Sequence, residues 1–319
     1  MGLAGINFEF AFSSQTALPP ESSFFSSFNR TDPGGETLRV SVTCLDRQKC
    51  DFSACASTAE LVSKFQTRIG ATWQDALHSS ASSLLPALLQ YANVTPEDIE
   101  NRQYVFGYAF NTIMRYDAVT RACVVHAVID TPIGRDAIAV MLISIFSFIF
   151  PWFDGFLFHA SGAFVDDCAC LFFGESGKGK STILALLTTA ATTLSDERCI
   201  IRKINDHYYL FETPWWRAEP VDREITARSR PLILFCLAHA TGTTSVTRLA
   251  ANEALHKMMY TLEGGQQPMV IPDKQTHAQQ MAFLRELAFR TPCFDLQVFK
   301  SDRFPEEFSS FLKNNIRSL

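Results

Sequence analysis

Residues 174–182 read Gly-Glu-Ser-Gly-Lys-Gly-Lys-Ser-Thr and carry the strongest chemical signal in the chain. They fit the pattern of a glycine, four variable positions and then Gly-Lys-Ser or Gly-Lys-Thr, which forms a loop around phosphate groups. Backbone N–H groups of such a loop converge on an anion, the lysine reaches the terminal phosphates, and the next hydroxyl ligates Mg²⁺. The predicted nucleotide-binding residues are Gly174, Glu175, Ser176, Gly177, Lys178, Gly179, Lys180, Ser181 and Thr182.

The segments on either side of this loop have the character that the pattern requires. Residues 168–173 (Cys-Ala-Cys-Leu-Phe-Phe) are typical of a short buried strand, and residues 182–189 are typical of an apolar helix. Strand, loop and helix therefore follow in the expected order, which argues against a glycine-rich turn that binds nothing.

A second group of chemically capable residues is Ser195-Asp196-Glu197-Arg198, in which Asp196 lies sixteen residues beyond Lys180. One helix and a returning strand span that distance, so the acids can come back to the loop. A phosphotransferase needs one carboxylate to hold Mg²⁺ and another to accept a proton from the attacking hydroxyl. Asp196 and Glu197 are the natural pair, although adjacent residues on a strand point to opposite faces unless the strand ends there.

Two histidines lie in segments that read as strands. His159 precedes the loop strand within Phe-His-Ala-Ser-Gly, and either a role near the transferred phosphate or a buried structural role fits its sequence context. His126 lies in the apolar stretch 122–129, where a structural role is the better interpretation.

Four stretches, taken in order, resemble the catalytic domain of the HPr kinase/phosphorylase family and of the HPr-kinase-like proteins found beside peptide-modifying enzymes. They are residues 157–162 (Leu-Phe-His-Ala-Ser-Gly), the loop with its strand at 171–182, residues 194–197 (Leu-Ser-Asp-Glu) and residues 212–215 (Glu-Thr-Pro-Trp). A phosphate loop alone occurs in many families, whereas this ordered set is much more specific. The resemblance implies an α/β fold like that of phosphoenolpyruvate carboxykinase, with a P-loop kinase domain built on a mixed β-sheet.

The same resemblance implies that the protein moves the γ-phosphate of ATP to a hydroxyl with the help of Mg²⁺. On the matching positions, His159 and Lys180 would act at the transferred phosphate and Ser181 would ligate the metal. Asp196 and Glu197 would supply the base and further metal contacts, and the match does not decide which acid does which. The hexameric assembly of HPr kinases, carried over to this chain, implies a homo-oligomer.

Several positions depart from the family pattern. Thr182 and Glu197 stand where HPr kinases carry an acidic residue and a second Asp, and residues 222–234 lack the glycine-containing HPr-recognition signature. The substrate is then a Ser or Thr of another peptide or protein in a modification pathway, or a small hydroxy compound such as an amino acid. The missing acid at Thr182 also leaves a non-catalytic ATP-binding partner module as an alternative.

Aromatic and basic residues near the fourth stretch have two interpretations each. Trp215 and Trp216 would shape the substrate side or lie at the edge of a core. Arg223, Arg228 and Arg230 would bind a nucleotide or acidic substrate, or lie on a solvated face.

Composition narrows the function classes further. With 319 residues, 47% hydrophobic content and 28 Phe, the chain can bury a large core, and its net charge of −5 and pI near 5.8 argue against nucleic acid as a partner. Nine Cys without metal-site spacing, and no signal-peptide pattern, favour free thiols and a cytoplasmic protein. Residues 137–153 are uncharged and mostly apolar, and we expect a buried helix over a sheet rather than a membrane segment.

The pattern of elements suggests two regions. Residues 1–150 read as an N-terminal α+β region that offers a substrate or partner surface, and residues 151–319 as the P-loop kinase domain. In the first region we predict strands at 38–44, 104–112 and 122–129, helices within 57–92 and a helix starting at Pro96. In the second we predict strands at 155–165, 193–203, 208–212, 231–238 and 294–299, and helices at 252–260, 275–289 and 305–316.

Overall fold

Three β-sheets with helices packed on them make up the described parts of the chain, so the fold is mixed α/β. The computed structural model describes residues 2–4, 6–14, 35–46, 61, 63–64, 85–101, 105–107, 112–129, 135–213, 230–240, 242–263 and 274–316. The chain divides into two units, Met1–Ile149 with Pro268–Ala278 and Phe150–Gln267 with Gln279–Leu319. Each unit is described by itself below.

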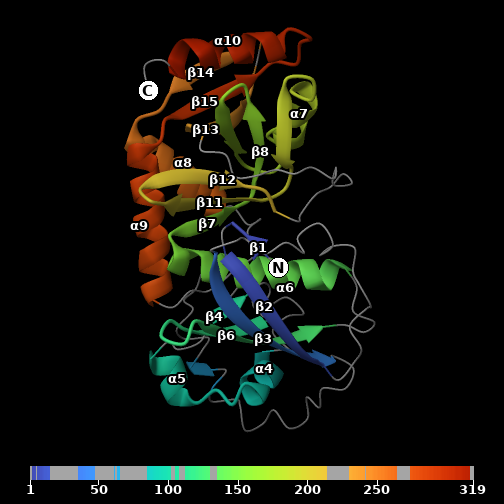
Figure 1. Cartoon of the computed structure of the whole chain (residues 1–319), viewed down its shortest axis with the longest axis vertical. Coiled ribbons are helices and arrows are strands. Elements are labelled where there is room, and N and C mark those ends of the chain that lie inside the picture. The colour runs from blue at the N-terminus through green and yellow to red at the C-terminus, as the bar shows by residue number, and fades with distance from the viewer. Residues whose placement is uncertain are drawn as a thin grey trace. The chain divides into compact units, whose positions relative to one another are not determined.

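The first unit contains a six-stranded sheet in the order β1-β2-β3-β6-β5-β4 (Figure 1). Its strands are β1 (Gly2–Leu3), β2 (Ile6–Ser14), β3 (Glu36–Asp46), β4 (Val105–Gly107), β5 (Thr112–Asp117) and β6 (Ala122–Ile129). The β2–β3 and β3–β6 pairs are parallel and the other pairs antiparallel, which makes the sheet mixed. In β3, Leu38, Val40 and Val42 are buried while Arg39 and Ser41 are exposed, as the period-two pattern predicts.

Helix α6 (Arg135–Ile149) covers one face of this sheet, as expected for the apolar stretch, and α4 (Leu85–Tyr91) lies against the other face (Figure 1). The ring of Phe146 on α6 lies 4.9 Å from the ring of Phe8 on β2. The α-helix ends before Pro151 and continues as the 3₁₀ turn Phe150–Phe153, because proline cannot donate the next helical hydrogen bond. Among the described residues, no helix is long and apolar enough to cross a membrane.

Helix α5 (Pro96–Asn101) begins where the sequence predicts. The Thr95 hydroxyl accepts a bond from the Asp98 N–H at 3.1 Å, and the Asp98 carboxylate accepts one from the Thr95 N–H at 2.8 Å. This reciprocal pair satisfies two N–H groups at the helix start. Most of the residues between 57 and 84, where further helix was predicted, lie outside the described residues.

The second unit has a six-stranded sheet in the order β10-β8-β9-β13-β15-β14 and a three-stranded sheet in the order β12-β11-β7. The strands of the larger sheet are β8 (Ala160–Val165), β9 (Cys168–Phe173), β10 (Ala191–Ser195), β13 (Leu232–His239), β14 (Ser245–Arg248) and β15 (Cys293–Val298). Those of the smaller sheet are β7 (Gly155–Phe158), β11 (Cys199–Ile204) and β12 (His207–Phe211).

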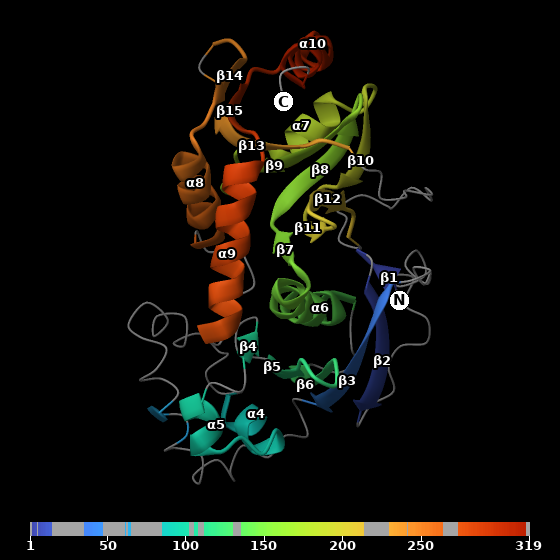
Figure 2. The ribbon, with the colours of Figure 1, turned by 60° about the vertical axis from the view of Figure 1, so that its left-hand side comes forward.

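The larger sheet is covered on both faces, which explains why its central strands are apolar throughout. Helices α7 (Lys180–Leu186) and α10 (Phe304–Ile316) pack on one face, where the Phe172 and Phe235 rings stack at 5.4 Å. Helices α8 (Ala251–Glu263) and α9 (Lys274–Arg290) pack on the other face together with residues of the smaller sheet (Figure 2).

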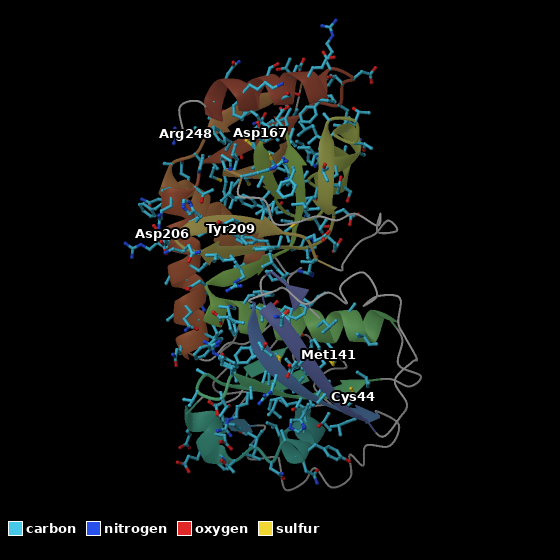
Figure 3. The ribbon with its side chains drawn as sticks, in the orientation of Figure 1. Cys44, Met141, Asp167, Asp206, Tyr209 and Arg248 are labelled. Carbon is cyan, nitrogen blue, oxygen red and sulfur yellow. The ribbon has the colours of Figure 1, made fainter. Side chains whose placement is uncertain are left out.

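The directions of the strands distinguish the two edges of the larger sheet. Strands β9, β10, β13 and β15 run parallel to one another and β8 runs antiparallel, so four carboxyl ends and the amino end of β8 share one edge. The β8–β9 turn lies at the opposite edge, where Asp166 accepts a hydrogen bond from Ser309 of α10 at 2.6 Å. Figure 3 labels the neighbouring Asp167 beside this helix.

An ion-pair network ties the smaller sheet to α9. Arg290 on α9 donates to both carboxylate oxygens of Asp206 in the β11–β12 turn at 2.7 Å, and Lys203 donates to Glu286 at 2.7 Å. Figure 3 shows Asp206 at the outer end of this hairpin, next to α9. The hydrogen bonds from Arg290 and Lys203, together with their positive charges, hold the pKa of Asp206 well below its usual range.

Two strand predictions are corrected by the structure. The expected strand 193–203 is two strands separated by residues 196–198, and the expected strand 155–165 breaks at His159, with β7 and β8 in different sheets. Of the expected strand 104–112, Val105–Gly107 form β4, Thr112 begins β5, and the other residues lie outside the described residues. In both corrected cases hydrogen-bonding partners far along the chain decide where pairing stops, and an apolar pattern does not contain that information.

Gly162 generates a prediction about packing in this unit. A Cβ at this position would lie 2.6 Å from the Cys199 sulfur, so Gly162→Ala should destabilise the unit by about 1–3 kcal/mol through overpacking. Combining it with Cys199→Ala removes the clashing sulfur. The loss of unfolding free energy in the double variant, measured by calorimetry, should therefore be smaller than the sum of the losses in the two single variants. Losses of unfolding free energy that simply add would contradict a clash between the new Cβ and the Cys199 sulfur.

Candidate functional site

The glycine-rich segment forms a loop between the buried strand β9 and helix α7, in the order that the sequence predicts. Gly177 and Gly179 have φ angles of 80° and 98°, which side-chain-bearing residues rarely adopt. A Cβ on Gly174 would lie 3.2 Å from the Leu237 carbonyl oxygen, so the loop starts in close contact with β13. The three glycines are therefore required by the local backbone.

Both lysines of the loop are bound to its own first residues. The Lys180 ammonium donates to the Gly174 carbonyl at 2.9 Å and to the Glu175 carbonyl at 3.1 Å. The Lys178 ammonium lies 3.6 Å from the Glu175 carboxylate in an exposed ion pair. Lys180 starts α7, and these bonds turn its charge back over the loop rather than away from it.

The acidic pair lies in the connection between β10 and β11, not on a strand. Strand β10 ends at Ser195, and the Ser161 hydroxyl donates to the Asp196 carbonyl at 3.1 Å. Because the strand has ended, the alternation that would send Asp196 and Glu197 to opposite faces does not apply. Both acids lie at the carboxyl end of β10, on the same sheet edge as the loop.

His159 lies at this edge as well. Ala160 pairs with Phe173, so the preceding His159 and the following Gly174 lie at the same end of the β8–β9 pair. His159 is 8% exposed, and its Nε2 is 3.8 Å from a Glu197 carboxylate oxygen. The structure thus brings His159, Glu197 and the start of the loop together.

A buried hydroxyl network fixes the connection that carries the acids. The Ser195 hydroxyl accepts bonds from the N–H groups of Glu197 at 3.4 Å and Arg198 at 3.2 Å. The Thr213 hydroxyl donates to the Arg198 carbonyl and lies 3.5 Å from the Ser195 hydroxyl. Thr213, which follows β12, is therefore bound to the segment 195–198.

Glu212 is a site candidate that the sequence reasoning did not select. It is partly buried, and this burial raises the pKa of its carboxyl to about 7. Within the described chain, no hydrogen bond or ion pair reaches its carboxylate. Burial is the main cause that raises the pKa of the Cys199 thiol, and the charges of Asp196 and Glu212 add to this effect. A single acid at the end of a predicted strand does not stand out in a sequence, so the pattern gave no signal for Glu212.

Other candidates lie elsewhere or outside the described residues. Arg230 donates to the Asp166 carbonyl at 2.6 Å and stacks over Phe164, at the edge opposite the loop, so its contacts are structural. Trp215, Trp216, Arg223 and Arg228 lie outside the described residues. Among the residues that the structure describes, no group of three or more His, Cys, Asp or Glu is arranged to hold a metal ion by itself.

Comparison with known proteins shows a distant likeness to a solved structure. No family model and no curated protein matches the chain. Among solved structures, the HPr(Ser) kinase/phosphatase from Coxiella burnetii matches 51% of this chain and 91% of its own, at 12% identity and a TM-score of 0.29. Overlap this weak does not establish a shared function, so the chemistry rests on the residues of this chain.

The burial of Glu212 predicts a pH-dependent stability. Its carboxyl ordinarily titrates near 4.5 and titrates near 7 in the folded protein, so the folded state holds the proton more tightly than the unfolded state. Relative to Glu212→Gln, the wild type should therefore lose stability as pH rises from about 4.5 to 7, by about 2 kcal/mol after allowance for solvent screening. Melting temperatures of both proteins between pH 4 and 8 measure this, and a difference that does not change with pH would contradict it.

Proposed function

We propose that this protein is an ATP- and Mg²⁺-dependent phosphotransferase that moves the γ-phosphate to a hydroxyl. The observation that carries the proposal is the shared sheet edge, at which the Lys180-bearing loop meets His159 and the connection that carries Asp196 and Glu197. In this proposal the second unit is a P-loop kinase domain of the HPr kinase and phosphoenolpyruvate carboxykinase type.

The residues at this edge suit the parts of the reaction. The loop supplies backbone N–H groups and the Lys180 charge for the phosphates, and Ser181 with a carboxylate supplies the oxygen ligands that Mg²⁺ prefers. Bound Mg²⁺ would neutralise charge on the β- and γ-phosphates. Asp196 and Glu197 divide the remaining tasks of holding the metal and accepting the hydroxyl proton, and His159 positions Glu197 from 3.8 Å.

The substrate in this proposal is a hydroxyl compound, with a Ser or Thr of a peptide or protein in a modification pathway as the first candidate. A small hydroxy compound uses the same chemistry. The described residues give no reason to prefer protein substrates over small ones, so the first assay should contain both peptides and small hydroxy compounds.

Lys180→Ala tests the phosphate contact. Loss of the ammonium removes charge stabilisation at the γ-phosphate and should lower the transfer rate by roughly 10²-fold or more. Transfer of labelled phosphate from ATP to a mixture of hydroxyl compounds and peptides measures it. Lys313→Ala, which removes an exposed lysine of α10 bound to Asp166, is the matched control and should keep full activity.

Asp196→Asn separates a kinase from a non-catalytic nucleotide-binding module. Removing the carboxylate charge should lower the transfer rate by roughly 10²- to 10⁴-fold while ATP still binds. The control is Asp167→Asn in the turn at the opposite edge, which should change neither quantity. If the wild type binds ATP without transferring phosphate, and Asp196→Asn binds ATP as the wild type does, the non-catalytic binding module would be favoured instead.

A further inference from the structure

Strand β10 contains an irregularity just before the acidic connection. Thr193 pairs with Ala163, and two residues later Ser195 pairs with the adjacent Gly162, so β10 has one extra residue here. Such a β-bulge reverses the alternation of side chains beyond it. Ala163 packs in the core under α7, whereas a Cβ on Gly162 would meet Cys199 of the smaller sheet. The bulge therefore moves Ser195 from the α7 side of the larger sheet to the side of the smaller sheet.

On that side Ser195 meets Thr213, and the two hydroxyls form a directed chain of hydrogen bonds. Thr213 gives its single hydroxyl proton to the Arg198 carbonyl, so the 3.5 Å bond between the two hydroxyls runs from Ser195 to Thr213. The Ser195 oxygen in turn accepts the N–H groups of Glu197 and Arg198. Both hydroxyl residues are fully buried, and bonds aligned in this way strengthen one another.

Ser161 on β8 supports the same connection from the neighbouring strand. It is fully buried, and its hydroxyl donates to the Asp196 carbonyl at 3.1 Å. Ser161, Ser195 and Thr213 belong to three of the four ordered stretches that stand out in the sequence, and the fourth stretch is the glycine-rich loop. Three stretches far apart in the chain thus each place one buried hydroxyl on the segment that carries both acids.

The effect of these bonds is geometric more than energetic. A hydrogen bond formed on folding replaces one to water, so its net contribution to stability is small. A buried network instead selects one course of the backbone, because any other course leaves polar groups without partners. Transfer of a phosphate requires its catalytic groups to be held in such a fixed arrangement.

We propose that Ser161, Ser195 and Thr213 are positioning residues for the transfer, and that the bulge in β10 places Ser195 for this task. They act through the backbone of residues 196–198 and set where the carboxylates of Asp196 and Glu197 lie relative to the loop. This inference rests on the proposed function, because the acids belong to the same site. Loss of one hydroxyl then slows the chemical step and leaves ATP binding, which depends on the loop, nearly unchanged.

Thr213→Val removes the hydroxyl and leaves a side chain of similar shape. We expect kcat for transfer from ATP to fall roughly 10- to 10²-fold, with KM for ATP within about twofold of the wild type, because a small misplacement of catalytic groups has this effect. Thr213→Ser keeps the hydroxyl and should recover most of the rate. Ser161→Ala should repeat the pattern, and it keeps the test decisive if Thr213→Val does not fold.

Thr244→Val is the matched control. The Thr244 hydroxyl also binds one N–H and one carbonyl, both of Phe299, at 3.2 and 3.4 Å. Its loss should leave kcat and KM unchanged, because these bonds join β14 to the end of β15 and do not reach the acidic connection.

Amide hydrogen exchange tests the hold on the connection without any measurement of activity. In the wild type, the N–H groups of Glu197 and Arg198 should exchange slowly although neither residue lies in a strand. Ser195→Ala removes their acceptor, and both amides should exchange roughly tenfold faster. Unchanged exchange in β13 would show that the release is local.

Unchanged exchange of the two amides in Ser195→Ala would overturn the inference, and so would wild-type kcat in both Thr213→Val and Ser161→Ala. Thr213→Ser as slow as Thr213→Val would also overturn it, because the hydrogen bond would then not be the cause. A wild type that protects both amides and transfers no phosphate to any hydroxyl compound overturns the proposed phosphotransferase, while the hold of the hydroxyls on the connection stands.

Discussion

Strand β8 is the constraint on which the candidate site depends, because it pairs with β9 on one side and β10 on the other. Ala160 pairs with Phe173 and Gly162 with Ser195, so one strand sets the position of the glycine loop relative to the acidic connection. Its own Ser161 hydroxyl then binds the Asp196 carbonyl. The close packing of Cys199 against Gly162 explains why this strand has no side chain at that point.

The sequence was informative where a local pattern is itself the cause of the structure. Alternation in residues 38–44, the Thr95–Asp98 helix start and the continuous apolar runs of β9 and β13 all reflect burial or capping that neighbouring residues determine. The glycine loop belongs to this group, because its positive φ angles are local requirements. For these elements only the boundaries differ by a few residues.

Where prediction failed, partners distant in sequence decide the outcome. The break after Ser195 depends on its hydroxyl accepting two N–H groups and on Thr213, eighteen residues away. The break at His159 depends on β7 pairing with β11 while β8 pairs with β9. Glu212 went unselected for the same reason, since its pKa reflects surroundings assembled by folding and a single acid in a sequence does not reveal them.

The bonds within the loop bear on how phosphate would be bound under the proposed function. The Lys180 ammonium now donates to two neutral carbonyl oxygens, and phosphate oxygens are stronger, charge-assisted acceptors for the same donor. The exposed Lys178–Glu175 ion pair adds little stability, so it offers little resistance to a rearrangement. The loop therefore keeps its cations close to the anion position at small energetic cost, while the acids across the edge remain fixed by Ser161, Ser195 and Thr213. Binding of phosphate would then change the contacts of two lysines and leave the connection that carries the acids in place.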